Sequence, residues 1–505
     1  MAQVVRLLLL SLLLLLFCSC AQSFTQRRNR GDSWSTEKHP TDRWFQQMLN
    51  HFSKNGSSFW SQAVAIEAVT WGQLAKDQIA SEEQRYFIND IFYKPGGPVF
   101  LFIKGENAAS RQMVTGLSKM VYLLTFFYTN GILNDDNYSL HGHRRDTFIK
   151  TTCQRDLSTA SLRYLNSRQA LADIVNFRTQ IAKTMGLIKN KWVIFGGSYG
   201  GSLAVWSRIK RPDLFFAAVG SSAPMLAKVN FYEYLEIFYR TLTTYNIECA
   251  RAVEKAFTLI VALVKIPEYY SMLADDFMLC EPLKINSEMD AAFFLHKMIY
   301  FIRIELNKIT IDDFCDLMTD TSLGSPYNRF ATIANMKIIN KKWSCLYANY
   351  SAFLEYFSLS SLDMQSIRRG RQWFYQCCTE FGFFQTTDSN NHPFSGLPLR
   401  YYVKRCSDVF GTGFNYDSLT WRVKANNIYY GGFNVNGSKI IFSNGSNDPW
   451  HFLGITKDIS RDLPAVFMKG EIHCADMYKQ MDTDSHELIQ AREKIFQILQ
   501  KWLKQ

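Results

Sequence analysis

The segment Gly196-Gly197-Ser198-Tyr199-Gly200-Gly201 constrains the fold more strongly than any other part of the chain. It follows the short apolar run 192–195 and precedes residues 202–210, where apolar residues recur with helical spacing. Glycines two residues before and after a serine suit a tight turn between a strand and a helix, because they relieve crowding of the backbone. Glycine turns without a catalytic role share this pattern, so the flanking strand and helix carry the inference. The segment predicts that Ser198 is an exposed nucleophile.

Further segments predict strands and helices in alternation. Short apolar runs typical of buried strands occupy residues 99–103, 217–220, 439–443 and 465–468. Residues 160–186 and the last twenty or so residues have the spacing of amphipathic helices, with Asp484 and Glu487 placed like a helix cap and its partner. Alternating strands and helices favour a largely parallel sheet with helices on its faces.

The middle of the chain has a different pattern. Between about 226 and 425 helical spacing dominates, at residues 252–264, 291–306 and 353–367, and most cysteines lie here. Cysteines in an oxidising compartment imply disulfides. We therefore expect an α/β main domain of residues 43–225 and 426–505 with a mainly helical, disulfide-stapled insertion at 226–425, which we call the helical insertion.

Residues 1–21 read as a signal peptide. Arg6 precedes an apolar run at 7–17 and small residues at 19–21. The run is shorter than the roughly 20 residues that span a bilayer, and no later stretch is long and uncharged enough, so we expect no membrane span after signal removal. A signal anchor is the alternative. Residues 22–42 are expected to be a polar leader. Five N-x-Ser triplets that fit a secreted glycoprotein lie at Asn55, Asn137, Asn349, Asn436 and Asn444.

Charge and ligand patterns narrow the partners. The net charge is +11, but the basic residues are scattered, which favours a solvated surface over a nucleic-acid site. No CxxC pair occurs, and His141-x-His143 is the closest histidine pair, so we expect neither a metal nor another cofactor.

Two further residues complete a catalytic pattern. Asp448 follows the strand 439–443, and His473 follows the strand 465–468. The chain order serine, acid, histidine is that of α/β-hydrolases. His473 would take the proton of Ser198, Asp448 would orient the imidazole, and the amide of Tyr199 would bind the oxyanion. As alternatives, Asp448 could be a turn residue and His473 an ordinary loop histidine; His451 and His486 are weaker candidates for the base.

The motifs resemble a known family. Gln84-Arg85-Tyr86-Phe87, residues 196–204, residues 444–450 and His473-Cys474-Ala475-Asp476-Met477 look like the family of lysosomal prolyl carboxypeptidase, dipeptidyl peptidase II and thymus-specific serine protease, closest to the thymus-specific branch. The similarity covers residues 84–117 and 155 to the C-terminus. It implies a serine exopeptidase that cuts peptides near proline through an acyl-enzyme, in the lysosome, the endosome or outside the cell.

The resemblance also implies finer assignments. Ser198, Asp448 and His473 would form the triad, and the turn with Gly105 and Glu106 would border the oxyanion hole. The implied disulfides are Cys249–Cys315, Cys280–Cys345 and Cys378–Cys406, which leaves Cys377 unpaired. The partner is a peptide, and a homodimer is compatible with the sequence. The attacked terminus is left open, as are an inactive peptide-binding relative and an esterase.

Two stretches depart from the family. Extra residues lie between Trp60 and Gln84, and residues 118–154 lack the family's strand ending in Glu-His-Arg-Phe-Tyr-Gly. We expect that strand beside the elbow strand, with the run 121–128 as its substitute. The turn at Gly105 is also less glycine-rich than in the family. We therefore expect impaired activity, and impaired folding, in this form; divergence, alternative splicing and a gene-model error would each explain the departure.

Overall fold

The computed structural model describes residues 95–105, 157–302, 310–357 and 370–505, and the backbone of 43–48, 81–87, 137–141, 358 and 365–369. The expected signal peptide and leader, the run 121–128, Asn55 and Glu106 lie outside these residues. Among the residues described, no helix is both long and apolar enough to cross a bilayer.

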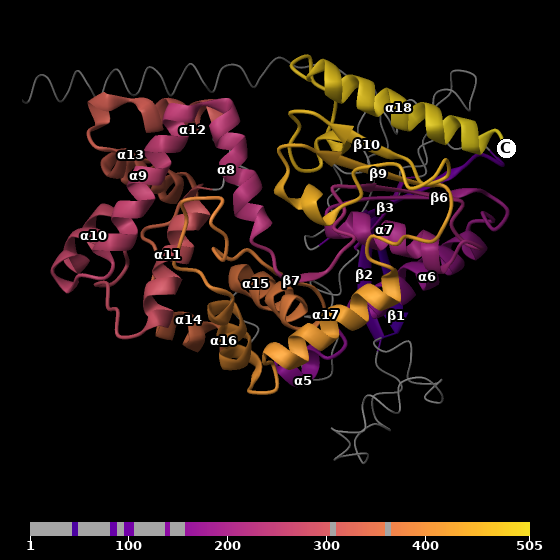
Figure 1. Ribbon diagram of the computed structural model, residues 1–505. Helices are drawn as coiled ribbons and strands as arrows, with labels where there is room; N and C mark the ends of the chain where they lie inside the picture. Colours follow the sequence, from indigo (N-terminus) through magenta and orange to yellow (C-terminus); the bar gives the residue numbers. More distant parts are fainter. Residues whose placement is uncertain are drawn as a thin grey trace, which may run out of the picture. The chain divides into compact units, whose positions relative to one another are not determined.

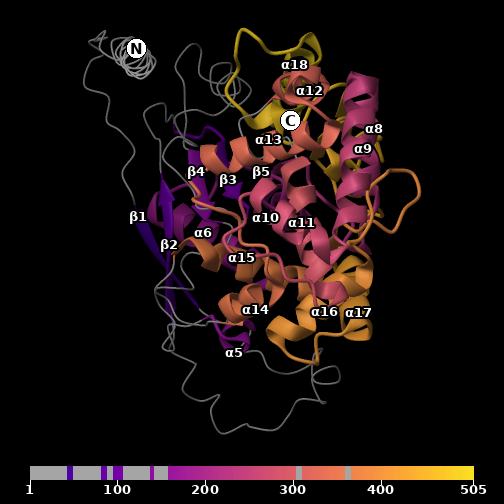
Figure 2. The same ribbon diagram turned by 90° about the vertical axis from the view of Figure 1, so that its left-hand side faces the viewer.

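The main sheet has eight strands in the order β1-β2-β4-β3-β5-β6-β9-β10. The strands β1 and β2 pair antiparallel, as do β2 and β4, and every other neighbouring pair is parallel. Their bounds are Arg43–Met48, Ser81–Phe87, Val99–Lys104, Asn137–His141, Trp192–Gly197, Ala217–Ser221, Ile440–Gly445 and Ala465–Met468 for β1, β2, β3, β4, β5, β6, β9 and β10. Figure 2 shows β1 and β2 at one side of β3, β4 and β5.

Alternating side chains bury both faces of this sheet. Leu101 and Ile103 of β3 belong to the core that contains α6 (Ser167–Thr184) and α7 (Tyr199–Lys210). Phe100 and Phe102 belong to a second core with α18 (His486–Leu503). Figure 1 shows α18 on one side of the sheet and α6 and α7 on the other. This layered, mostly parallel sheet is an α/β-hydrolase fold, as expected.

The five apolar runs predicted as strands are confirmed as β3, β5, β6, β9 and β10. The helix predicted at 160–186 is wrong in one respect, because α5 (Thr159–Leu162) ends before Asn166, which caps α6 by accepting from the Gln169 amide. The cap predicted at Asp484 is also wrong. Ser485 caps α18 through the Leu488 amide, while Asp484 pairs with Arg492 at 2.5 Å.

The strand β4 corrects two expectations about the tract 118–154. Polar residues 137–141 occupy the place between β2 and β3, so the predicted substitute at 121–128 is not the strand described there. We expected the family's strand beside the elbow strand β5. In the sheet β4 lies beside β3 instead, and the neighbours of β5 are β3 and β6. Strand pairing uses main-chain groups, and a polar sequence can therefore supply it.

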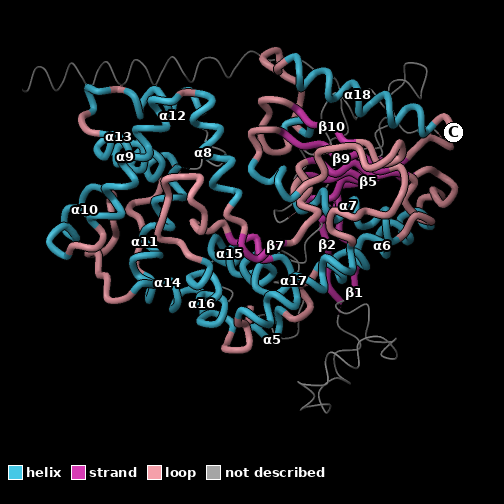
Figure 3. Tube along the Cα trace, in the orientation of Figure 1, coloured by secondary structure: helices cyan, strands magenta, loops and turns pink. Residues whose placement is uncertain are grey.

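The chain between β6 and β9 is mostly helical (Figure 3). Two short strands here, β7 (Lys228–Asn230) and β8 (Gly382–Phe384), pair parallel to each other, and an isolated parallel bridge joins Leu279 to Leu346. The segment predicted as one helix at 353–367 contains parts of two, α14 and α15. The helices are α8 (Glu233–Tyr245), α9 (Ile247–Leu263), α10 (Tyr270–Asp276), α11 (Glu288–Ile302), α12 (Ile311–Thr319), α13 (Pro326–Asn340), α14 (Tyr350–Ser358), α15 (Gln365–Gln376), a π-helix (Cys377–Phe381), α16 (Leu399–Phe410) and α17 (Tyr416–Tyr430).

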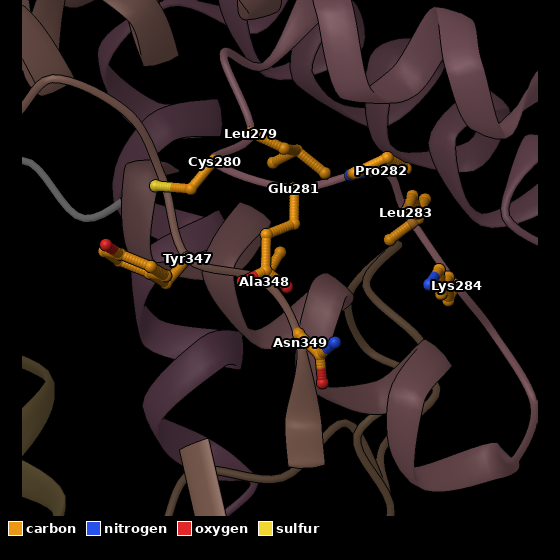
Figure 4. Close-up of a pocket in the computed structure, with 9 residues that line it drawn as sticks. All are labelled: Leu279, Cys280, Glu281, Pro282, Leu283, Lys284, Tyr347, Ala348 and Asn349. Carbon is orange, nitrogen blue, oxygen red and sulfur yellow. The ribbon is translucent and has the colours of Figure 1, made fainter. Parts of the chain in front are cut away.

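Three disulfides staple these helices. They join Cys249 to Cys315, Cys280 to Cys345 and Cys378 to Cys406, which confirms the pairing that the family resemblance implied. Among the described cysteines, Cys377 and Cys474 lie outside these disulfides, and both are buried. A small pocket lies beside Cys280, and Figure 4 shows the residues that line it. Its volume of about 10 Å³ is enough for one water molecule and too small for a peptide.

Replacing Cys249 and Cys315 together by serine should destabilise the protein. The bridge closes a loop of 66 residues, and chain entropy predicts a loss of about 4 kcal/mol in the free energy of unfolding. Thermal unfolding of the purified protein measures the loss. The control Cys377→Ala removes a buried thiol without opening a loop and should cost less; equal losses for the two proteins would contradict the prediction.

Candidate active site

Ser198 lies on a turn that excludes side chains. It connects β5 to α7 with φ 58° and ψ −131°, a backbone conformation that non-glycine residues rarely adopt. A Cβ added at Gly196 would lie 2.1 Å from the carbonyl oxygen of Gly200. A Cβ added at Gly200 would lie 2.5 Å from the oxygen of Ile103. The glycines are therefore required by close backbone approach, as a nucleophile elbow demands.

Asp448 and His473 are joined by a hydrogen bond. The Nδ1 of His473 lies 2.9 Å from Oδ2 of Asp448, whose side chain is fully buried, while His473 is 22% exposed. The other carboxylate oxygen accepts the Trp450 amide at 3.0 Å. Because Nδ1 donates to the carboxylate, Nε2 of His473 carries the lone pair that a general base needs. Asp448 thus orients the imidazole.

The electrostatic surroundings of His473 favour its protonated form. Burial lowers the pKa of His473, but the charges of Cys474 and Asp448, together with their hydrogen bonds, outweigh burial and raise the pKa well above its ordinary value. His473 is consequently a stronger base than a free histidine, and it becomes protonated at a higher pH.

The end of β6 connects the serine turn to the histidine loop. The carbonyl oxygen of Ser221 accepts the Ser198 amide at 2.8 Å. The next hydroxyl, Ser222 Oγ, accepts the amide of Cys474 at 2.8 Å. A Cβ added at Gly197 would lie 3.0 Å from the Cys474 sulfur, so the residue before Ser198 contacts the residue after His473. The turn that carries Ser198 and the loop that carries His473 are therefore in direct contact.

The side chain of Asp476 links the two strands, β6 and β9, next to these loops. Its buried carboxylate accepts the hydroxyl of Ser221 at the end of β6 and the hydroxyl of Ser443 in β9, the latter at 2.7 Å. Burial raises the pKa of Asp476, and the two serine hydroxyls oppose this effect. Arg492 of α18 donates to the carbonyl oxygens of Ala475 and Asp476. Sequence reasoning assigned Asp476 no role, because its hydrogen bonds reach residues that are distant in the chain.

The expected oxyanion site is described only in part. Tyr199 follows the nucleophile directly and begins α7, so its amide lies at the turn. A Cβ added at Gly105 would lie 2.9 Å from the amide nitrogen of Gly200, which places the end of β3 against the same turn. Glu106, the other residue predicted here, lies outside the described residues.

Comparison with known proteins now assigns the family. The model of the family described as serine carboxypeptidase S28 matches residues 76–495. The chain belongs to this family. Thymus-specific serine protease of Homo sapiens is 30% identical over 473 residues, covering 89% of each chain. The protein of the same name from Mus musculus is 34% identical over 365 residues, covering 69% of this chain and 71% of its own.

The chain is also similar to more distant proteins. Lysosomal Pro-X carboxypeptidase of Bos taurus is 25% identical over 451 residues, covering 83% of this chain and 84% of the relative. Among solved structures, proline iminopeptidase of Mycobacterium smegmatis overlaps 83% of this chain and 96% of its own, with 10% identity and a TM-score of 0.32. The family model over residues 76–495 and the two relatives at 30% and 34% identity show that this S28 chain is a serine peptidase, as the resemblance of its motifs implied.

In this S28 peptidase an aromatic cluster lies beside the histidine. The ring of Trp450 is 6.4 Å from that of His473. On its other sides Trp450 contacts Phe231, Tyr234 and Phe383, all from the helical insertion, at 5.5, 5.9 and 5.2 Å between ring centroids. The insertion therefore supplies an apolar wall next to the Asp448–His473 pair.

The alternative bases and glycosylation sites are placed as follows. Nδ1 of His451 donates to the carbonyl oxygen of Asp448 at 2.7 Å, and His486 is exposed on α18, so neither meets the Asp448 carboxylate. Asn436 is exposed and Asn349 half-buried, while Asn137 begins β4. The prediction at Asn444 is wrong for the folded chain, because that side chain is 1% exposed and its Nδ2 donates to Ile455.

The reactivity of Ser198 should decline as the pH falls through the pKa of His473, because the imidazolium cannot accept a proton. Since that pKa is raised, the half-maximal rate of fluorophosphonate labelling should occur above pH 6.5, the ordinary value. Removing one cause of the shift with Cys474→Ala should move the midpoint to lower pH. The control Cys377→Ala should leave the midpoint in place, and a midpoint below 6.5 in the unmodified protein would contradict the prediction.

Asp476→Ala should destabilise the fold and slow labelling of Ser198. The change leaves the hydroxyls of Ser221 and Ser443 without their acceptor, which should cost about 2–4 kcal/mol in the free energy of unfolding. Denaturant titration measures this loss. Asp476→Asn retains one oxygen acceptor and should lose less; an alanine variant as stable as the unmodified protein would refute the role.

Proposed function

We propose that this S28 peptidase is an exopeptidase in which Ser198, Asp448 and His473 form the catalytic triad. The observation that carries the proposal is the 2.9 Å hydrogen bond between Asp448 and His473, in a loop that contacts the turn of Ser198. The strained conformation of Ser198 adds support, since strain of this kind concentrates at functional sites.

The geometry supports an acyl-enzyme mechanism. Nε2 of His473 takes the proton of the Ser198 hydroxyl as Oγ attacks the carbonyl carbon of the scissile peptide bond. The oxyanion of the tetrahedral intermediate is held by the Tyr199 amide, beside which Gly105 at the end of β3 packs against the same turn. His473 then gives its proton to the departing amine, the C–N bond breaks, and an ester on Ser198 remains. Water hydrolyses that ester by the same steps, with His473 again acting as base and then as acid.

The helical insertion favours action at the end of a peptide. Trp450 contacts Phe231, Tyr234 and Phe383 of the insertion, so the insertion borders the site where an extended chain would have to continue. The same aromatic wall suits an apolar ring such as that of proline. The relative named lysosomal Pro-X carboxypeptidase supports proline specificity and a lysosomal location. Three disulfides fit the secretory pathway.

Ser198→Ala should abolish labelling by a fluorophosphonate while leaving the fold intact. The reagent phosphonylates only an activated serine, and the small change at a half-buried position should alter thermal unfolding little. Labelling of secreted, glycosylated protein, with unfolding measured beside it, tests this. Labelling that persists in the variant would reject Ser198 as nucleophile, and no labelling of folded, unmodified protein would indicate an inactive relative.

A panel of substrates tests the specificity. We expect hydrolysis of peptides with proline next to the bond that releases a terminal piece, and weak hydrolysis of the same sequence blocked at both ends. Turnover of short acyl esters without turnover of any peptide would favour the esterase alternative.

A further inference from the structure

A buried carboxylate joins the helical insertion to the main domain. Glu380, in the π-helix Cys377–Phe381, accepts the Ser167 amide at 3.0 and 3.1 Å and the Ser167 hydroxyl at 2.6 Å. Ser167 is the first residue of α6, where unpaired amides favour a negative charge. Tyr430 of α17 donates in turn to the Ser167 hydroxyl at 2.9 Å. Ser167, Glu380 and Tyr430 are all less than a tenth exposed.

The side chain of Gln376 connects the carboxylate of Glu380 to Tyr199, the residue that follows Ser198. Nε2 of Gln376 lies 3.1 Å from Oε2 of Glu380 and 3.4 Å from the hydroxyl of Tyr199, and it donates to both. The ring of Tyr199 packs against Trp373 and Phe381, with centroids at 5.7 and 5.3 Å. Tyr199 follows Ser198, so its side chain is held by the insertion while its backbone forms the catalytic turn.

The energetics make this connection sensitive to small changes. Burial raises the pKa of Glu380, and the donors Ser167 and Gln376 together with the charge of Arg168 oppose that effect. A buried carboxylate costs several kcal/mol unless its donors are in place, so its position is tightly specified. The disulfide of Cys378 further fixes the same π-helix to α16.

We propose that Glu380 is a positioning residue, which through Gln376 sets the place of Tyr199 and hence of the oxyanion-binding amide. The inference rests on the proposed role of Tyr199 in catalysis. It assigns the insertion a part in the chemical step besides enclosing the peptide. A shift of Tyr199 by a fraction of an ångström would weaken stabilisation of the transition state more than binding of the substrate.

The test compares Glu380→Gln and Gln376→Met with the unmodified protein, once a peptide substrate is in hand. Glutamine at 380 keeps the shape but leaves one of the donors from Ser167 or Gln376 without an acceptor. We expect kcat to fall roughly tenfold to a hundredfold with KM changed less than about threefold. The second-order rate of fluorophosphonate labelling should fall with kcat. If Glu380→Gln fails to fold, Gln376→Met alone tests the connection.

Tyr350→Phe is the matched control. It removes a buried hydroxyl that donates to the carboxylate of Asp408 at 2.8 Å, within the insertion and without contact to Tyr199. The control should lower stability without lowering kcat. Folded variants at 380 and 376 with unchanged kcat would overturn the inference, and so would losses in kcat no larger than that of the control. The labelling of Ser198→Ala is measured separately and tests the proposed function. If Ser198→Ala loses labelling while Glu380→Gln keeps full activity, this inference is wrong and the proposed function still holds.

The double variant adds a readout that a purely structural role would not produce. If Glu380 acts through Gln376, the fall in kcat for the pair should be close to that of either single change, since both interrupt one connection. Multiplied losses would show that the two residues act independently and would overturn the route through Gln376.

Discussion

The close approach of backbone to backbone around Ser198 is the constraint on which the rest of the site depends. The oxygen of Ile103 and the turn at Gly196 and Gly200 leave no room for a side chain, so β3, β5 and α7 can meet only with glycine at these positions. The resulting turn gives Ser198 a positive φ and points the chain directly into a helix. Once this packing is fixed, the parallel pairing of β5 with β6, of β6 with β9 and of β9 with β10 brings the ends of these strands to the same edge. Asp448 follows β9 there, and the loop with His473 follows β10.

Three buried carboxylates then order the loops at that edge. Asp448 orients His473, Asp476 ties β6 to β9, and Glu380 ties the helical insertion to α6. Each is costly to bury, and each is satisfied by donors from a different part of the chain. An uncompensated buried charge destabilises more than a mispacked apolar side chain, so the donors fix the geometry more sharply than apolar packing would. The pairs Ser221–Asp476 and Ser167–Glu380 are separated by 255 and 213 residues, respectively.

That separation explains what the sequence could and could not predict. Short apolar runs were enough to place β3, β5, β6, β9 and β10, because strands buried on both faces are apolar throughout. The order of Ser198, Asp448 and His473 at the ends of such strands indicated the site. The polar strand β4 escaped prediction because its pairing uses main-chain groups, and Ser485 was missed because two neighbouring residues can both cap a helix. The roles of Asp476 and Glu380 depend on contacts across the fold that no local pattern encodes.

The environment of His473 also bears on where such a peptidase would work. Asp448 and Cys474 raise the pKa of the base, which increases its strength but leaves it protonated in acid. A carboxylate that accepts a hydrogen bond from the imidazole both orients the ring and raises its pKa. The two effects have the same cause, so they occur together. In an acidic compartment His473 would be protonated when no substrate is bound. Turnover there would require the bound peptide to lower the pKa of His473, for example by excluding water from the partly exposed ring. The same hydrogen bond that assembles the candidate triad thus sets the range of pH in which it can begin the reaction.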